Sequence, residues 1–198
     1  MDSEMFLSSS VGRRVLQALA AVMESRLRYR YFGPAKTLRG AGPLQGRRVL
    51  EIGCGTGFFT LPAAELIGGE GELVAIDVLQ ESVDHVSQRV SDSGLENVRV
   101  HLASALDTGL ESGSFDTVLL FGVIPAPMLP LEALLSEVHR LLREDGTLAV
   151  WPWVPIWLPD AVVRSGLFAY TGRHGGVSRF VRRRVARPAA TGRLETEP

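Results

Sequence analysis

Residues 49–57, which read Val-Leu-Glu-Ile-Gly-Cys-Gly-Thr-Gly, constrain the fold of this chain more than any other feature. A short apolar run that leads into three alternate glycines is typical of the first strand and turn of a dinucleotide-type α/β unit. Glycine adopts backbone angles that other residues avoid, and it has no Cβ to keep a ligand away from the main chain. We therefore expect a buried strand here, followed by a ligand-binding loop.

A second apolar run, Leu-Val-Ala-Ile-Asp at residues 73–77, ends in a carboxylate. An acidic residue about 20 positions after a glycine loop, at the end of the second strand, suits the two hydroxyls of a ribose. Together the loop and Asp77 predict a site for a cofactor that contains adenosine.

The spacing of the glycines narrows the choice of cofactor. Nicotinamide and flavin sites favour Gly-x-Gly-x-x-Gly, whose loop brings a pyrophosphate to a helix N-terminus. This chain instead has Glu51 two residues before Gly53, with further glycines at positions 55 and 57. A carboxylate at position 51 would repel a pyrophosphate but suits a cofactor with a cationic amine and a sulfonium. A nicotinamide-dependent oxidoreductase is therefore the less favoured alternative.

On these residues the segment resembles the first motif of class I S-adenosylmethionine-dependent methyltransferases, and Asp77 resembles the acidic residue of their second motif. Residues 113–120 and 135–146 are most similar to the small-molecule branch that includes the ubiquinone and menaquinone methyltransferases. The resemblance covers about residues 45–183. It implies an α/β, Rossmann-like, doubly wound and mostly parallel seven-stranded sheet with an antiparallel C-terminal hairpin, and S-adenosylmethionine as the cofactor.

Hydrophobic periodicity gives the same alternation of strands and helices, which implies a parallel sheet with helices on both faces. A turn is expected at residues 145–146, between the last long helix and the fifth strand. The strands are predicted at 48–52, 72–77, 98–102, 115–121 and 147–153, and the hairpin strands at 167–173 and 177–183. Helices are predicted at 59–67, over the segment that contains Val83, Val86 and Val90 and ends near Gly94, and at 131–142.

Three parts are expected along the chain. Residues 1–40 are predicted to form an amphipathic helical segment that serves as a lid over the site or as a homodimer contact. Residues 41–184 are expected to form the methyltransferase domain. Residues 185–198, rich in Pro, Thr and Gly, are expected to form a mobile tail.

Composition excludes several other classes of protein. The 198 residues suit one domain, 45% of them are hydrophobic, and a formal net charge of −1 gives no general reason to bind nucleic acid. Cys54 is the only cysteine, which excludes a disulfide within the chain. No apolar run approaches the ~20 residues that span a bilayer. We expect a cytoplasmic protein without stable membrane insertion and without a nucleic-acid partner.

The expected cofactor contacts lie in the glycine loop and at the ends of strands: Glu51, Gly53, Cys54, Gly55, Gly57, Asp77, Val78, Ser104, Ala105 and Phe121. Glu51 is expected to orient the loop and balance the cationic amino end of the cofactor. Asp77 is expected to accept two ribose hydroxyls. A tight strand-to-helix turn is a purely structural role that the glycines can also serve.

One position departs from the family pattern. The family usually carries an acidic residue at the end of the third strand, where it accepts a hydrogen bond from the adenine amino group. Here the aligned residues are Ala103, Ser104 and Ala105, and a hydroxyl is a weaker acceptor than a carboxylate. Asp107 could reach in from the loop instead. The change leaves open a non-catalytic, methyltransferase-like binding or regulatory protein.

The acceptor side is less defined. Trp151 and Trp153 either form an aromatic wall for an apolar or planar small molecule, or cover the fifth strand as core residues. The four histidines show no metal-ligand spacing, so no metal is expected. No residue is identified as a catalytic base.

Overall fold

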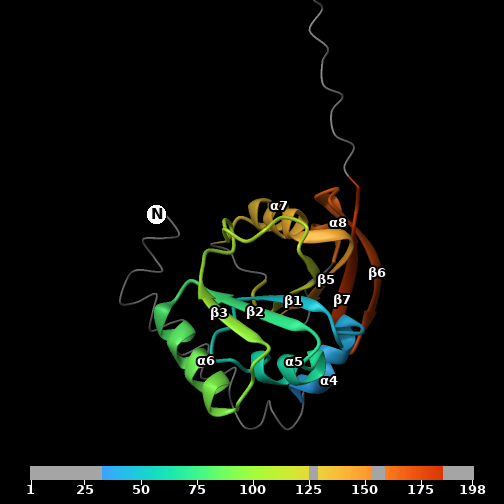
Figure 1. The fold of residues 1–198 in the computed structure, drawn as a ribbon. Coiled ribbons are helices and arrows are strands. Elements are labelled where there is room, and N and C mark those ends of the chain that lie inside the picture. The colour runs from blue at the N-terminus through green and yellow to red at the C-terminus, as the bar shows by residue number, and fades with distance from the viewer. Residues whose placement is uncertain (1–32, 125–128, 153–158, 185–198) are drawn as a thin grey trace, which may run out of the picture.

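The computed structural model describes residues 33–124, 129–152 and 159–184. Within them a seven-stranded sheet lies between two layers of helices (Figure 1). The strand order is β3-β2-β1-β4-β5-β7-β6. The predicted fold class, a doubly wound and mostly parallel seven-stranded sheet of the Rossmann-like type, is confirmed.

The strands are β1 (Arg48–Ile52), β2 (Glu72–Asp77), β3 (Val98–Leu102), β4 (Phe115–Phe121), β5 (Leu142–Trp151), β6 (Phe168–His174) and β7 (Val177–Arg182). The helices are α4 (Pro34–Leu38), the 3-10 turn η1 (Arg39–Ala41), α5 (Thr60–Ile67), α6 (Gln80–Asp92), α7 (Leu131–Leu141) and α8 (Asp160–Arg164). The first four strands have the bounds predicted from their apolar runs.

Strands β1 to β5 pair in parallel, and their two faces bury separate hydrophobic clusters. Helices α4, α5 and α6 cover one face, and α7 and α8 cover the other (Figure 1). Strand β4 is buried on both faces, which accounts for its nearly continuous apolar sequence. The strand order reverses between β1 and β4, so the carboxyl ends of these two strands flank the crevice where such sheets bind ligands.

The C-terminal strands form the predicted antiparallel hairpin. Strand β7 lies between β5 and β6 and is antiparallel to both. Gly175 and Gly176 make the turn with φ of 56° and 85°, a region that side chains with a Cβ rarely occupy. The hairpin extends the sheet beyond β5, on the side away from β3.

The start of β5 differs from the prediction. The strand begins at Leu142, directly after α7, because Leu142 is fully buried and pairs with Phe115. Regular pairing resumes only at Thr147 opposite Thr117, and the chain between is irregular. The turn expected at residues 145–146 therefore lies inside an irregular strand and does not separate a helix from a strand.

The described chain before β1 contains two short helical elements. Helix α4 and η1 pack on the same sheet, with Leu38 fully buried and Ala41 4% exposed. The expected domain boundary at residue 40 falls inside η1. The predicted helix within residues 1–32 and the predicted tail at residues 185–198 lie outside the described residues. None of the helices in the described part of the chain combines the length and apolar character needed to cross a membrane.

Candidate functional site

The glycine loop follows β1 and is tied to the end of β2. The backbone N–H groups of Gly53 and Cys54 both donate to the carbonyl oxygen of Ile76, at 2.8 and 3.0 Å. Gly53 and Gly55 have φ of 77° and 53°, where residues with a Cβ are strained. A Cβ on Gly53 would lie 2.9 Å from Val123 Cγ2, whereas a Cβ on Gly55 would meet nothing within 4 Å. The main chain at Gly55 is therefore open to a ligand.

Gly57 has a mainly structural role. Its φ is 79°, and a Cβ at this position would lie 3.2 Å from Val86 Cγ2 on α6. The guanidinium of Arg89, also on α6, donates to the carbonyl oxygen of Thr56. The end of the loop is thus held against α6, and only its first half faces open space.

Asp77, the last residue of β2, is fixed to the loop by its carboxylate. Its Oδ2 accepts a hydrogen bond from the N–H of Gly55 at 2.9 Å, and its Oδ1 accepts one from the N–H of Leu79 at 3.0 Å. Burial raises the pKa of Asp77, and the backbone N–H donors partly offset this effect. Each carboxylate oxygen has two acceptor positions, so each keeps one for a ligand hydroxyl.

Glu51 lies beneath the loop and is only 3% exposed. Its Oε2 accepts a hydrogen bond from the hydroxyl of Thr60, the first residue of α5, at 2.7 Å. Burial raises the pKa of Glu51 to about 8, the hydrogen bond from Thr60 lowers it, and the charge of Asp77 raises it further. The side chain that was expected to orient the loop therefore joins β1 to α5, and at neutral pH it is mostly protonated.

Cys54 does not provide a nucleophile in this site. The side chain is 4% exposed and packs in the core beside Phe58 and Phe59. Burial, with the nearby charges of Glu51 and Asp77, raises the pKa of the thiol. A neutral thiol is a poor nucleophile, so Cys54 acts here as a small apolar residue.

Phe121 and Trp151 belong to an aromatic cluster below the carboxyl edge of the sheet. The ring of Phe59 makes edge-to-face contacts with Phe121 at 5.0 Å and with Trp151 at 5.6 Å between centroids. Phe121 is only 4% exposed, so contact of a cofactor with its side chain is limited. Trp151 is half-buried against the same cluster, so part of its side chain packs in the core and part stays exposed. Trp153 lies outside the described residues.

The end of β3 supplies the other side of the site. Ser104 is exposed, and its Oγ accepts a hydrogen bond from the N–H of Leu106 at 3.2 Å. Ala105 is half-buried against the core. Asp107 is exposed and makes a backbone bridge with Ser104.

Two exposed apolar side chains lie at this edge of the sheet. Val78 follows Asp77 and is 46% exposed, and Leu102, the register partner of Asp77, is 52% exposed. Sequence reasoning selected Val78 but missed Leu102. Leu102 could have been selected from the sequence, because it is a large apolar residue at the end of a strand, shortly before a polar turn. Each of the two side chains leaves apolar surface exposed at this edge of the sheet.

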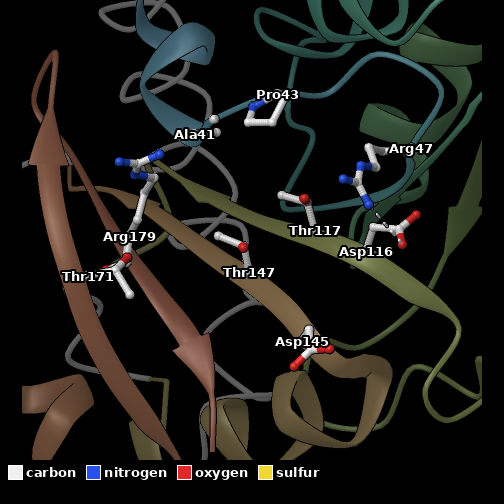
Figure 2. Close-up of a pocket in the computed structure, with 10 residues that line it drawn as sticks. Ala41, Pro43, Arg47, Asp116, Thr117, Asp145, Thr147, Thr171 and Arg179 are labelled. Carbon is white, nitrogen blue, oxygen red and sulfur yellow. Dashed lines mark hydrogen bonds and ion pairs between the residues drawn. The ribbon is translucent and has the colours of Figure 1, made fainter.

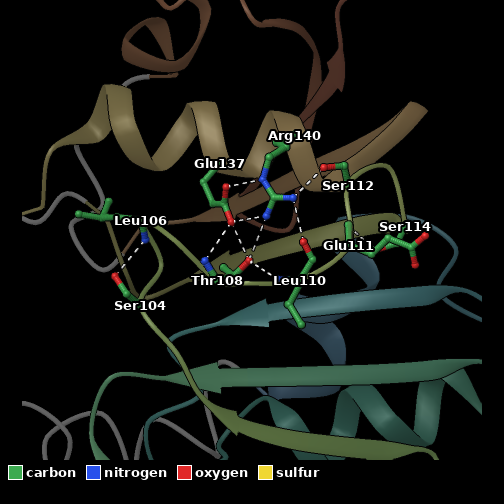
Figure 3. A network of polar contacts seen from close by, with 9 residues as sticks. All are labelled: Ser104, Leu106, Thr108, Leu110, Glu111, Ser112, Ser114, Glu137 and Arg140. Atoms are coloured by element: carbon green, nitrogen blue, oxygen red, sulfur yellow. Dashed lines mark hydrogen bonds and ion pairs between the residues drawn. The ribbon is translucent and has the colours of Figure 1, made fainter.

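Figure 3 shows a polar network that holds the loop after β3 against α7. Glu137 Oε1 accepts hydrogen bonds from the Thr108 N–H at 3.0 Å and from its hydroxyl at 2.6 Å. Arg140 donates to both carboxylate oxygens of Glu137 at 2.7 Å and to the carbonyl oxygen of Leu110 at 2.8 Å. The network fixes the loop that carries Ser104. Sequence reasoning missed it, although a glutamate between the buried residues of a helical stripe was a signal.

In the described part of the chain no group of three or more His, Cys, Asp or Glu side chains could hold a metal ion. The site at the carboxyl ends of β1, β2 and β3 is thus built from backbone amides, one carboxylate and apolar surface. Such a site suits an organic ligand that carries hydroxyls and a flat apolar group.

Comparison with known proteins identifies the family. A model of the methyltransferase domain family matches residues 49–146. Aklanonic acid methyltransferase DauC of Streptomyces sp. (strain C5) is 31% identical over 167 residues, which cover 82% of this chain and 71% of that protein. This chain belongs to the S-adenosylmethionine-dependent methyltransferases. The matched region includes the glycine loop and Asp77, so the predicted family is confirmed.

Other relatives of this chain match over shorter stretches. Nocamycin O-methyltransferase of Saccharothrix syringae is 35% identical over 114 residues, which cover 57% of this chain and 40% of that protein. Demethylmenaquinone methyltransferase of Lactococcus lactis is 27% identical over 128 residues, which cover 62% of this chain and 50% of that protein. The chain therefore spans half or less of the length of these two relatives.

A solved structure shares the fold of this chain over most of its length. The S-adenosylmethionine-dependent methyltransferase from Aquifex aeolicus superposes with a TM-score of 0.68 at 20% identity, covering 83% of this chain and 96% of that one. At this identity the likeness concerns the fold alone. It places the seven-stranded sheet and its C-terminal hairpin among methyltransferase structures.

The buried carboxyl of Glu51 predicts a characteristic dependence of stability on pH. Its folded pKa of about 8 lies above the ordinary value of 4.5, so between these values the folded protein binds more protons than the unfolded chain. The free energy of unfolding should fall as pH rises through this window. The variant Glu51→Gln keeps an acceptor for Thr60 but cannot ionise, so its slope should be smaller, as measured by urea denaturation between about pH 5 and 8.

The matched control is Glu65→Gln, an exposed glutamate on α5. We expect this variant to keep the slope of the unchanged protein. An equal slope in Glu51→Gln and in the unchanged protein would show that Glu51 is not held protonated by burial.

The network around Glu137 predicts a pH dependence of stability that is opposite in sign to the one predicted for Glu51. Hydrogen bonds from Arg140 and Thr108 lower the pKa of Glu137 from 4.5 to about 2, although burial alone would raise it. The ionised Glu137 therefore contributes to stability above pH 4.5, and this contribution is lost as the pH falls toward 2. The variant Glu137→Gln should lower the free energy of unfolding by about 1.5–3 kcal/mol at neutral pH, because charge-assisted hydrogen bonds are lost. Hydrogen exchange should also show faster exchange of the Thr108 amide.

The control for this prediction is Glu132→Gln, an exposed residue on the same helix. It should change stability by less than about 0.5 kcal/mol. The structural role of Glu137 would be contradicted by equal effects of the two substitutions.

Proposed function

We propose that this chain binds S-adenosylmethionine and transfers the methyl group to a small-molecule acceptor. The observation that carries the proposal is the hydrogen bond from the Gly55 N–H to Asp77, with open space beside Gly55 at the carboxyl ends of β1 and β2. Membership of the methyltransferase family supports it.

Each part of the cofactor has a matching part of the site. The main chain of Gly53 and Gly55 would face the methionine portion and the ribose. Asp77 would accept the ribose hydroxyls with its two remaining acceptor positions. Val78 and Leu102, both exposed and apolar, would contact the adenine.

The adenine amino group would lie near the turn after β3. The hydroxyl of Ser104 already accepts the N–H of Leu106 and keeps a further acceptor position. Because a neutral acceptor binds less strongly than a carboxylate, adenine recognition should depend more on Val78 and Leu102 than on Ser104. Ala105 would contribute packing.

Glu51 would respond to the positive charge of the bound cofactor. A cation near a buried carboxyl favours its ionised form, so binding should lower the pKa of Glu51 from about 8 and release a proton. The carboxylate so formed would balance the cationic amine. This role agrees with the expectation from the sequence that Glu51 balances the cationic amino end of the cofactor. In the folded protein the Glu51 side chain is hydrogen-bonded to Thr60 and not to the loop.

The bound cofactor supplies an electrophilic methyl group, whose bond to the sulfonium breaks as the acceptor atom attacks in line and the electron pair remains on sulfur. The residues of this chain contribute by holding that methyl group in line with the acceptor. Proximity and alignment supply about 7–11 kcal/mol of barrier reduction in favourable cases. No nucleophile from the protein is required, in agreement with the buried and neutral Cys54.

We propose a small organic molecule as the acceptor. Relatives of this chain are named for methyl transfer to nocamycin, aklanonic acid and demethylmenaquinone. The half-buried Trp151 at the end of β5 would line the edge of an apolar acceptor pocket, with Trp153 as a further proposed contact. The sequence also raised the alternative of a protein that binds the cofactor without turnover. The exposed and neutral Ser104 would favour that alternative.

Removal of the Asp77 carboxylate tests the cofactor site. The variant Asp77→Asn should weaken binding of S-adenosylmethionine and S-adenosylhomocysteine roughly 100-fold or more, because two hydrogen bonds from the ribose to a charged acceptor are lost. Isothermal titration calorimetry measures both affinities. Asp92→Asn, an exposed aspartate at the end of α6, is the control and should bind as the unchanged protein does.

Undiminished affinity in Asp77→Asn would contradict the assignment of the ribose site. No binding of either ligand by the folded, unchanged protein would contradict the proposed function. Binding followed by release of S-adenosylhomocysteine with an aromatic or quinone acceptor would support it, whereas binding without turnover would favour the non-catalytic alternative.

We also propose that the N-terminal segment acts as a lid over the acceptor site or as a homodimer contact. Its amphipathic, apolar pattern at residues 10–30 supports this role. Deletion of residues 1–30 should raise KM for the acceptor if the segment is a lid, or convert a dimer to a monomer in sedimentation analysis if it is a contact. Unchanged kinetics together with an unchanged oligomeric state would exclude both roles.

A further inference from the structure

A small polar cavity lies on the sheet face covered by α4 and η1, away from the glycine loop (Figure 2). Its volume is about 140 Å³. The chain from η1 to β1 forms one wall, and strands β4, β5, β6 and β7 form the other. The polar side chains that line it are Arg47, Asp116, Thr117, Asp145, Thr147, Thr171 and Arg179.

The cavity is separate from the proposed cofactor site. Thr117 lies near the amino end of β4, whereas Phe121 ends that strand at the edge that carries the glycine loop. Four residues of extended strand span about 13 Å. A ligand in this cavity would therefore not reach the transferred methyl group.

Arg179 is the uncompensated charge in this cavity. In the part of the chain that the structure describes, its guanidinium forms no ion pair, and its Nε is buried without a hydrogen-bond partner. Its Nη1 lies against Gly42, where an added Cβ would be 3.4 Å away and the φ of 103° is unsuited to other residues. A buried donor without an acceptor is unfavourable, so this group calls for an oxygen ligand.

Two threonine hydroxyls line the same cavity, from the adjacent strands β4 and β5. Thr117 is only 5% exposed, and across residues 33–124, 129–152 and 159–184 neither its hydroxyl nor that of Thr147 has a hydrogen-bond partner. Figure 2 shows both side chains between Arg179 and the Asp116–Arg47 pair. They offer two O–H donors to the ligand that Arg179 binds.

The carboxylates of the cavity do not neutralise Arg179. Asp116 is already engaged by Arg47 at 3.8 Å, by the guanidinium of Arg143, and by the N–H of Arg48 at 2.8 Å. Asp145 is exposed, and Figure 2 shows it away from the Arg179 guanidinium. The Arg179 end of the cavity is therefore positive and rich in donors.

We infer that this cavity binds a small oxyanion, a carboxylate or a phosphate group, through the Arg179 guanidinium and the hydroxyls of Thr117 and Thr147. A guanidinium fork matches the paired oxygens of either group. Arg179 on β7 lies against Gly42, which is in the chain before β1. An anion held by Arg179 therefore connects these two segments. This site is independent of the proposed methyl transfer and serves an effector or a stabilising ion.

The test compares the melting temperature of the unchanged protein in increasing sodium phosphate and in increasing sodium acetate, with sodium chloride holding the ionic strength constant. A ligand that binds only the folded state stabilises it in a saturable way. We expect a saturable rise of melting temperature with at least one of the two salts. A rise with phosphate alone identifies a phosphate site, and a rise with acetate alone identifies a carboxylate site.

Variants decide whether the effect belongs to this cavity. Arg179→Gln should abolish the rise, and Arg173→Gln, which removes the same charge from an exposed position on β6, should keep it. Thr117→Val has nearly the same shape and should raise the apparent Kd several-fold, which tests the site even if Arg179→Gln folds poorly. No saturable rise with either salt, or a full rise in Thr117→Val together with Arg179→Gln, would overturn the inference.

Discussion

The hydrogen bond between the Gly55 N–H and the Asp77 carboxylate is the contact on which the candidate site depends. It forms because β1 and β2 are parallel neighbours in register, with Ile52 opposite Ile76, so their carboxyl ends meet at one edge. The N–H groups of Gly53 and Cys54 bind Ile76 and turn the chain back over the end of β2. The carboxylate is thereby held in one orientation before any ligand arrives, which lowers the entropic cost of binding.

Two buried glutamates show how surroundings shift the pKa of a carboxyl group in opposite directions. Glu137 has Arg140 and Thr108 as donors, and its pKa falls to about 2, so it is a permanent anion that fastens a loop. Glu51 has one hydroxyl donor and the charge of Asp77 nearby, and its pKa rises to about 8. A carboxyl group left without a cation in the folded protein is a poor stabiliser but a ready partner for a cationic ligand.

The sequence predicted those parts of the fold that depend on local patterns. Strands β1 to β4 match their expected bounds because each is a short apolar run with polar or glycine neighbours. The start of β5 could not be predicted, because Leu142 joins the sheet only through its pairing with Phe115. Helix α4 and η1 are too short to show a period. Asp77 and the glycines were predictable from spacing, whereas the roles of Leu102 and Glu137 depend on where a distant strand and helix bring them.

The cavity around Arg179 and the edge that carries the glycine loop lie at opposite ends of the same face of the sheet. Along β4 the residues on this face change from Thr117 through Leu119 to Phe121, and along β5 they change from Thr147 through Ala149 to Trp151. Leu119 and Ala149 are fully buried, so on β4 and β5 an apolar pair lies between the two threonines of the cavity and the edge that carries the glycine loop. Because Leu119 and Ala149 are register partners on adjacent strands, the position of this apolar pair is set by the pairing of β4 with β5.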